Sequence, residues 1–228
     1  MATKISDVVS AIQGGEVERL RGLLAEDPEL ATARIVDAKG VARTLLHVVA
    51  DWPGHFPNGA ESVAVLIAAG ADPNSRADGC GTHAETPLHW AASSDDIAVL
   101  DALLDGGADI EAPGAVLTNG TPMSDAVVFA QWNAARRLLE RGAKTTLTQA
   151  AALGLLDRVA QEFAERAPSR DEITKSFWHA CRAGHQCTAA YLLDRGADLH
   201  WIGWDHKTPL QAAQESGADD VVRWLRER

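Results

Sequence analysis

The stretch Thr86-Pro87-Leu88-His89-Trp90-Ala91-Ala92, followed at 107–109 by Gly-Ala-Asp, decides how this chain folds. Threonine is a good N-cap, and proline suits the first helical turn because the N–H that it lacks has no partner there. The glycine that follows the second apolar run can adopt the left-handed conformation with which helices end. The stretch therefore predicts two helices joined by a short turn.

The same pattern recurs along the chain. Matching helix starts are Thr44-Leu45-Leu46-His47, Thr121-Pro122-Met123-Ser124 and Thr208-Pro209-Leu210-Gln211, and matching helix ends lie at 66–72, 138–143 and 192–198. Thr-Pro-Leu-His with a later Gly-Ala-Asp resembles the ankyrin repeat, whose period is about 33 residues. The resemblance implies an all-α solenoid of helix-turn-helix units with short β-fingers, about seven units when degenerate caps are included.

The resemblance covers nearly the whole chain and predicts a single ankyrin-repeat domain over residues 1–228. Its expected units are an N-terminal capping repeat at 1–37, inner repeats at 38–74, 75–111, 112–144, 145–170 and 171–200, and a C-terminal capping repeat at 201–228. The fifth and sixth units are expected to start at Thr145 and Lys175. Because Thr145 follows Gly142 almost at once, the finger between repeats four and five is predicted to be missing.

Residues 51–59 form an insertion between the two helices of repeat two. Two prolines and two glycines exclude a continuous helix there, so the sequence predicts a structured loop. We expect this loop to turn inward and to contact the finger around His83. Asp51 and His55 would then lie over the aromatic end of the groove.

Composition restricts the partners. The formal net charge of −11 excludes nucleic acid and an anionic membrane surface as the expected partner, because both require basic patches. Apolar runs are far shorter than the ~20 residues that span a bilayer, and the N-terminus does not resemble a signal peptide. Three cysteines make a disulfide framework improbable. The expected location is the cytoplasm.

Candidate ligand-binding residues follow from helical periodicity. In the ankyrin architecture the first helix of each unit lines the concave face, and residues four apart share one side of a helix. The resulting pairs are Val48/Trp52, Trp90/Ser94, Asp125/Phe129, Gln149/Leu153 and His179/Ala183. With the loop residues added, the predicted ligand-binding set is Asp51, Trp52, His55, Trp90, Ser94, Asp125, Phe129, Gln149 and His179.

Other ring side chains receive different interpretations. His47 and His89 occupy the motif position that the family uses to bond the backbone between repeats, so they are expected to be structural. Trp178 occupies the same position in the sixth unit and is expected in the core. Trp201 and Trp204 lie on the last finger and could form an exposed patch.

The leading hypothesis is non-catalytic recognition of a small molecule, peptide or protein in an aromatic-lined concave groove. The first alternative is an enzyme in which Asp125 and His179, with Asp51, form an acid–base site acting on a hydrophobic metabolite. The second is a protein–protein adaptor that uses the Trp201/Trp204 end. No cofactor is expected, and Cys181, His185 and Cys187 lack the paired spacing of a zinc site, so no metal is expected either.

Overall fold

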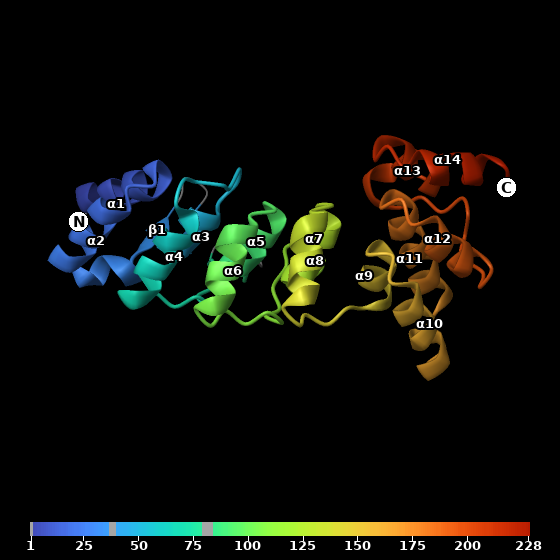
Figure 1. Cartoon of the computed structure of the whole chain (residues 1–228), viewed down its shortest axis with the longest axis horizontal. Coiled ribbons are helices and arrows are strands. Elements are labelled where there is room, and N and C mark those ends of the chain that lie inside the picture. Colours follow the sequence, from blue (N-terminus) through green and yellow to red (C-terminus); the bar gives the residue numbers. More distant parts are fainter. Residues whose placement is uncertain (1, 37–39, 79–83) are drawn as a thin grey trace. The chain divides into compact units, whose positions relative to one another are not determined.

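The computed structural model describes residues 2–36, 40–78 and 84–228, without the side chains of residues 2 and 3. It separates into two compact units, residues 1–143 and 144–228, and each unit consists of helix pairs (Figure 1). The boundary falls where the sequence predicts a missing finger, and the segment 141–146 contains no strand. The single domain expected over residues 1–228 stays a prediction.

In the first unit, four helix pairs follow one another, with a finger after the first pair. The elements are α1 (Ala2–Gly14), α2 (Val17–Glu26), the 3₁₀ turn η1 (Pro28–Thr32), β1 (Arg34–Val36), β2 (Ala42–Thr44), α3 (Leu45–Ala50), α4 (Gly59–Ala68), α5 (Pro87–Ser93), α6 (Ile97–Asp105), α7 (Pro122–Val128) and α8 (Trp132–Glu140). Apolar residues just inside the first helices, such as Leu46, Leu88 and Met123, are completely buried between neighbouring pairs.

The predicted helix starts at Thr44, Thr86 and Thr121 are the N-caps of α3, α5 and α7. Glycines also end the helix pairs as predicted, since Gly107 and Gly142 have φ of +92° and +98°. These values lie in the left-handed region, which glycine enters without steric cost. The repeat register of the first unit is therefore confirmed.

The motif histidines join one repeat to the next. His47 Nδ1 accepts from the backbone N–H of Thr44 (3.2 Å), and its Nε2 lies 3.0 Å from the carbonyl oxygen of Glu85. His89 makes the equivalent contacts with Thr86 and Gly120. A carbonyl can only accept, so Nε2 carries the proton. Burial lowers the pKa of both imidazoles to about 4, which keeps them neutral.

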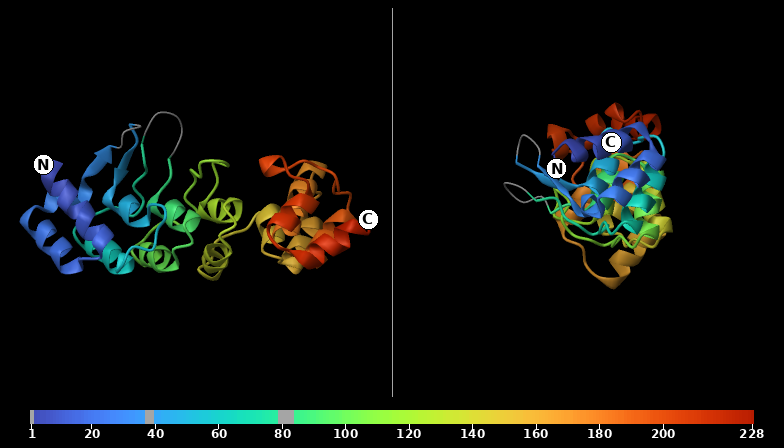
Figure 2. Two further views of the ribbon diagram at one scale, coloured as in Figure 1. Left: turned by 90° about the horizontal axis from the view of Figure 1, so that it is seen from above. Right: turned by 90° about the vertical axis from the view of Figure 1, so that its left-hand side faces the viewer.

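The first finger pairs β1 with β2 in antiparallel register, with Ile35 opposite Arg43, and it projects from the helices (Figure 2). A backbone bridge between Ala42 and Asp78 connects it to the next finger segment. Arg34 donates to the carbonyl of Arg76, and Arg76 donates in turn to the carbonyls of Ala84 and Pro113. Successive fingers are thereby tied together at their bases.

The second unit contains three helix pairs. Its elements are α9 (Leu147–Ala152), α10 (Leu156–Glu165), α11 (Arg170–Arg182), α12 (Gln186–Leu193), the 3₁₀ turn η2 (Trp204–His206), α13 (Pro209–Glu215) and α14 (Asp219–Arg226). Two predicted starts are wrong. The N-cap of α9 is Thr146, one residue after Thr145, and α11 begins after its cap Ser169 rather than at Lys175. In both cases the side chain that closes a capping box determines the start.

Trp178 lies in the core, as predicted, and links two neighbouring repeats by a hydrogen bond, as the motif histidines do. Counted back from the turn glycine Gly184, it aligns with His89 in α5, and it is 1% exposed. Its indole Nε1 donates to the carbonyl of Lys207 (2.9 Å), the residue before the N-cap Thr208. An indole N–H thus replaces an imidazole N–H between repeats six and seven.

Candidate functional site

Trp90 lies on α5, four residues after the N-cap Thr86, and is half-buried. Its Nε1 donates to Glu85 Oε2 (2.9 Å), and its ring meets the edge of His47 at a centroid distance of 4.9 Å. The guanidinium carbon of Arg43 lies 5.9 Å from the ring centroid. Three contacts therefore hold the indole in one orientation, which reduces the entropy that a partner would have to remove on binding.

Glu85 connects this tryptophan to the following finger. Its Oε1 accepts from the backbone N–H of Val116 (2.8 Å) while its Oε2 accepts from Trp90. Val116 and the neighbouring Leu117 both expose their apolar side chains. The sequence interpretation missed Glu85 and Arg43, although an acid directly before Thr86-Pro87 was a visible signal.

Asp51 is connected to Trp90 through Arg43. It is the C-cap of α3, and its Oδ2 accepts from Arg43 Nη1 at 2.5 Å, the same guanidinium that approaches the Trp90 ring. The guanidinium of Arg43 thus lies between Asp51 and Trp90 in this series of contacts, and it neutralises the charge of Asp51.

Asp125 is the most unusual side chain in the first unit. It lies four residues after the N-cap Thr121, so it occupies on α7 the position that Trp90 occupies on α5. The residue is 1% exposed, and neither carboxylate oxygen makes a hydrogen bond with a described residue. Burial, together with the negative charge of Glu85, raises its pKa to about 8. At neutral pH the group is therefore mainly a neutral carboxylic acid.

The inserted loop, residues 51–59, contacts two of the turns between helices. His55 donates from its backbone to Asp96 Oδ2 (2.7 Å), and its Nε2 lies 3.1 Å from the carbonyl oxygen of Ser94. Asn58 reaches the carbonyl of Gly15 (3.0 Å). The loop thus packs against the turns that join the helices of repeats one and three. Contact with His83 was predicted, and that residue lies outside the described part of the chain.

Several predicted groove residues have other roles. Trp52 is 80% exposed, because α3 already ends at Ala50 and the tryptophan is not one turn above Val48. Ser94 is the buried C-cap of α5 and faces the carbonyl of Ala50 (3.4 Å). Phe129 is the C-cap of α7 and is 43% exposed. An aromatic-lined groove at these positions stays a prediction.

Gln149 belongs to the capping box of α9. Its Oε1 accepts from the backbone N–H of Thr146 (2.8 Å), so it stands in the motif-histidine position and Ala150 follows it. The predicted groove position was displaced by one residue because the helix starts at Thr146. The observed role of the Gln149 amide is therefore to cap the start of α9.

His179 lies in the second unit, four residues before the C-cap Ala183 of α11, as Trp90 lies four residues before Ser94 in α5. It is 4% exposed, and its Nδ1 makes no hydrogen bond with a described residue. Burial, together with the positive charge of Arg182, lowers the pKa of this imidazole to about 4. A neutral imidazole and a neutral Asp125 therefore occupy different units, and an acid–base pair between them stays a prediction.

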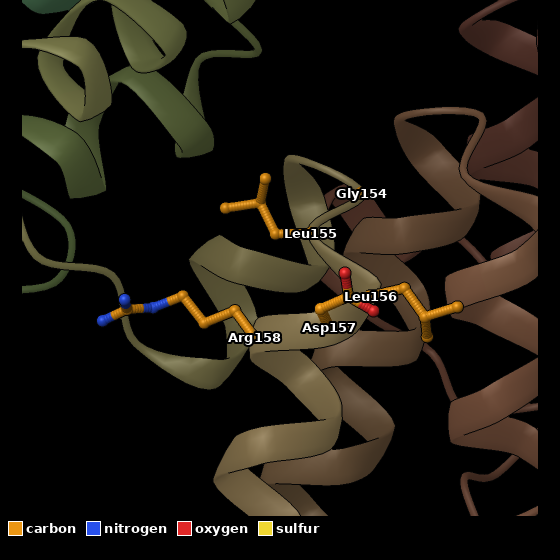
Figure 3. Close-up of a pocket in the computed structure, with 5 residues that line it drawn as sticks. All are labelled: Gly154, Leu155, Leu156, Asp157 and Arg158. Atoms are coloured by element: carbon orange, nitrogen blue, oxygen red, sulfur yellow. The ribbon is translucent and has the colours of Figure 1, made fainter.

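Each unit has a surface hollow. One, of about 500 Å³, is lined by 154–158 at the turn between α9 and α10, where Leu155 and Arg158 extend to the same side (Figure 3). Another, of about 400 Å³, lies under the inserted loop and is lined by His55, Glu61 and Asp96 among others. Both are open to solvent.

No group of three or more His, Cys, Asp and Glu side chains in the described part of the chain could hold a metal ion. Nor does that part contain a helix long and apolar enough to cross a membrane. Of the cysteines described, Cys181 is buried and Cys187 is exposed, and both are free thiols.

Comparison with known proteins agrees with the architecture. Residues 46–149 match the family described as ankyrin repeats in three copies. Over 141 residues, the chain is 31% identical to a transient receptor potential cation channel subfamily A member 1 homolog of Caenorhabditis elegans. The match covers 61% of this chain and 10% of that protein, so the chain spans a small fraction of its relative. The chain therefore carries ankyrin repeats at residues 46–149, and further helix pairs follow them in the second unit.

Proposed function

We propose that the first unit binds a peptide segment of a protein partner around Trp90. Ankyrin repeats are protein-binding modules, and this chain carries them at 46–149. The observation that favours Trp90 as the anchor is its fixed, half-buried indole, held by Glu85, His47 and Arg43. Tryptophan is enriched among the residues that dominate binding energy.

The surroundings favour an extended partner over a compact ligand. Trp52 and Phe129, which were expected to enclose a small molecule, are exposed. Val116 and Leu117 instead extend the apolar surface onto the finger that Glu85 holds. A peptide can contact both the inner helix and the finger, whereas a small molecule would need walls.

The test uses a phage-displayed library of random twelve-residue peptides, selected on the full chain. Selected peptides should bind Trp90→Ala roughly 30-fold more weakly or worse, the scale of a strong anchor residue. Glu85→Gln should weaken binding less, because the indole itself is retained. The matched control is Trp204→Ala, which removes an exposed tryptophan from the last finger and should leave affinity unchanged.

Two results would contradict the proposal. One is a selection that enriches no peptide over background. The other is a set of peptides whose affinity is the same for the wild type and for a Trp90→Ala protein with an unchanged circular dichroism spectrum. The catalytic alternative with Asp125 and His179 stays a prediction. Burial of both Asp125 oxygens is unfavourable for it, because a substrate would have to reach them.

A further inference from the structure

The negative charge of the chain is concentrated in one unit. Residues 1–143 contain ten Lys and Arg against twenty Asp and Glu, a formal charge of −10. Residues 144–228 contain eleven against twelve, a formal charge of −1. The unit that carries Trp90 therefore has almost all of the electrostatic attraction for a cationic partner.

Most of the described cations of the first unit are already engaged within it. Of its nine described basic residues, eight contact a carboxylate or carbonyl of the same unit: Lys4, Arg19, Arg21, Arg34, Arg43, Arg76, Arg137 and Arg141. They hold pairs such as Arg137 with Asp101 at 2.8 Å. The acidic surplus is thus left for a partner to neutralise.

Two carboxyl groups flank the proposed anchor. Glu85 holds the Trp90 indole, and Asp125 occupies the equivalent position on the next inner helix. The two acids are close enough to interact electrostatically. Asp125 is buried, and neither of its oxygens has a hydrogen-bond partner among the described residues. A buried carboxyl group without a partner is costly, and a cation placed beside it would satisfy it.

We infer that the peptide is basic and that it places a lysine or arginine side chain beside Trp90, between Glu85 and Asp125. This inference rests on the proposed function and specifies its ligand. The alkyl stem of the cation would lie on the indole, and its charge would lie beside Glu85, from where it would favour the ionised form of the buried Asp125. Because Asp125 is protonated in the free protein at neutral pH, binding of the cation would release its proton to solvent.

The experiment uses the peptides selected against the full chain. They should be enriched in Lys and Arg relative to the unselected library, and replacing the critical Lys by norleucine should weaken binding about tenfold or more. Affinity should also fall about tenfold from about 50 mM to about 500 mM NaCl, because salt screens charge attraction. Calorimetry at pH 7 in buffers of different ionisation enthalpy should show release of close to one proton per peptide, and Asp125→Asn should abolish that release.

The outcomes separate the two proposals. Peptides that depend on Trp90 but are not enriched in basic residues would overturn this inference and leave the proposed function intact. Basic peptides that bind without proton release would also overturn it, because their cation would then lie away from Asp125. A selection that yields no Trp90-dependent peptide would overturn both.

Discussion

Replacing Asp125 by asparagine should make the protein more stable at and above neutral pH. The native carboxyl group is buried without a hydrogen-bond partner among the described residues, and its pKa is raised to about 8 from an ordinary value of 3.8. Ionisation is therefore opposed in the folded state and free in the unfolded state. Asparagine has nearly the same shape and cannot ionise, so it removes this penalty.

The size of the effect follows from the linkage between proton binding and folding. Between pH 3.8 and about 8 the folded state holds a proton that the unfolded state has lost, so stability falls as the pH rises. Between pH 7 and pH 8 the wild type should lose about 1 kcal/mol from this group, at roughly 1.4 kcal/mol per full proton and pH unit. Burial of His47, His89 and His179 works in the opposite direction. Their lowered pKa values make stability rise with pH between about 4 and 6.5, below this window.

Urea unfolding at a series of pH values between 7 and 8 measures this slope for both proteins. Native-state hydrogen exchange at α5 and α7 assigns the change to the first unit, and the carboxyl carbon of Asp125 should titrate near pH 8 by NMR. The Asp125→Asn protein should show no such loss of stability. Equal slopes in the two proteins, or an Asp125 midpoint near pH 4, would refute the reasoning.

Three further sets of substitutions test the fold. Gly107→Ala should destabilise the protein by about 1 kcal/mol because the φ of Gly107 is +92°. Gly22→Ala, in the exposed interior of α2 with open space around it, should instead stabilise it by about 0.5–1 kcal/mol. Thermal melts of both variants check the repeat register, and equal shifts in melting temperature would contradict it. Trp178→Phe should cost about 1–3 kcal/mol by leaving a carbonyl without its donor, while Trp204→Phe should change stability by less than about 0.5 kcal/mol in urea unfolding. Asp96→Ala should cost about 1–3 kcal/mol and speed hydrogen exchange in residues 52–58, because this carboxylate both caps α6 and accepts from the loop; unchanged exchange there would show that the loop is held by other contacts.

Local capping chemistry made the fold predictable. Threonine followed by proline predicts the starts of α5 and α7 because cap preferences act within one turn of helix. The same logic failed at Thr145 and Lys175, where another hydroxyl residue lay nearby. At Ser169, the Glu172 side chain closes a capping box that outweighs the repeat spacing.

The candidate site was less predictable, since it depends on contacts between repeats. Periodicity correctly placed Trp90 and Asp125 at equivalent positions of neighbouring inner helices. It could not show that Glu85 would support the indole, because that contact depends on how the chain enters α5. Trp52 was misassigned because a helix was assumed to continue past Ala50.

The tryptophan that joins the last two repeats bears on how such repeats are recognised. The family match stops at residue 149, whereas helix pairs with the same joint continue to Trp178 and its acceptor at Lys207. At His47, His89 and Trp178 the donor to the next repeat is a ring N–H, and histidine is one way to supply it. A sequence search that accepts tryptophan as well as histidine at this position would therefore find divergent repeats that a search for histidine alone misses.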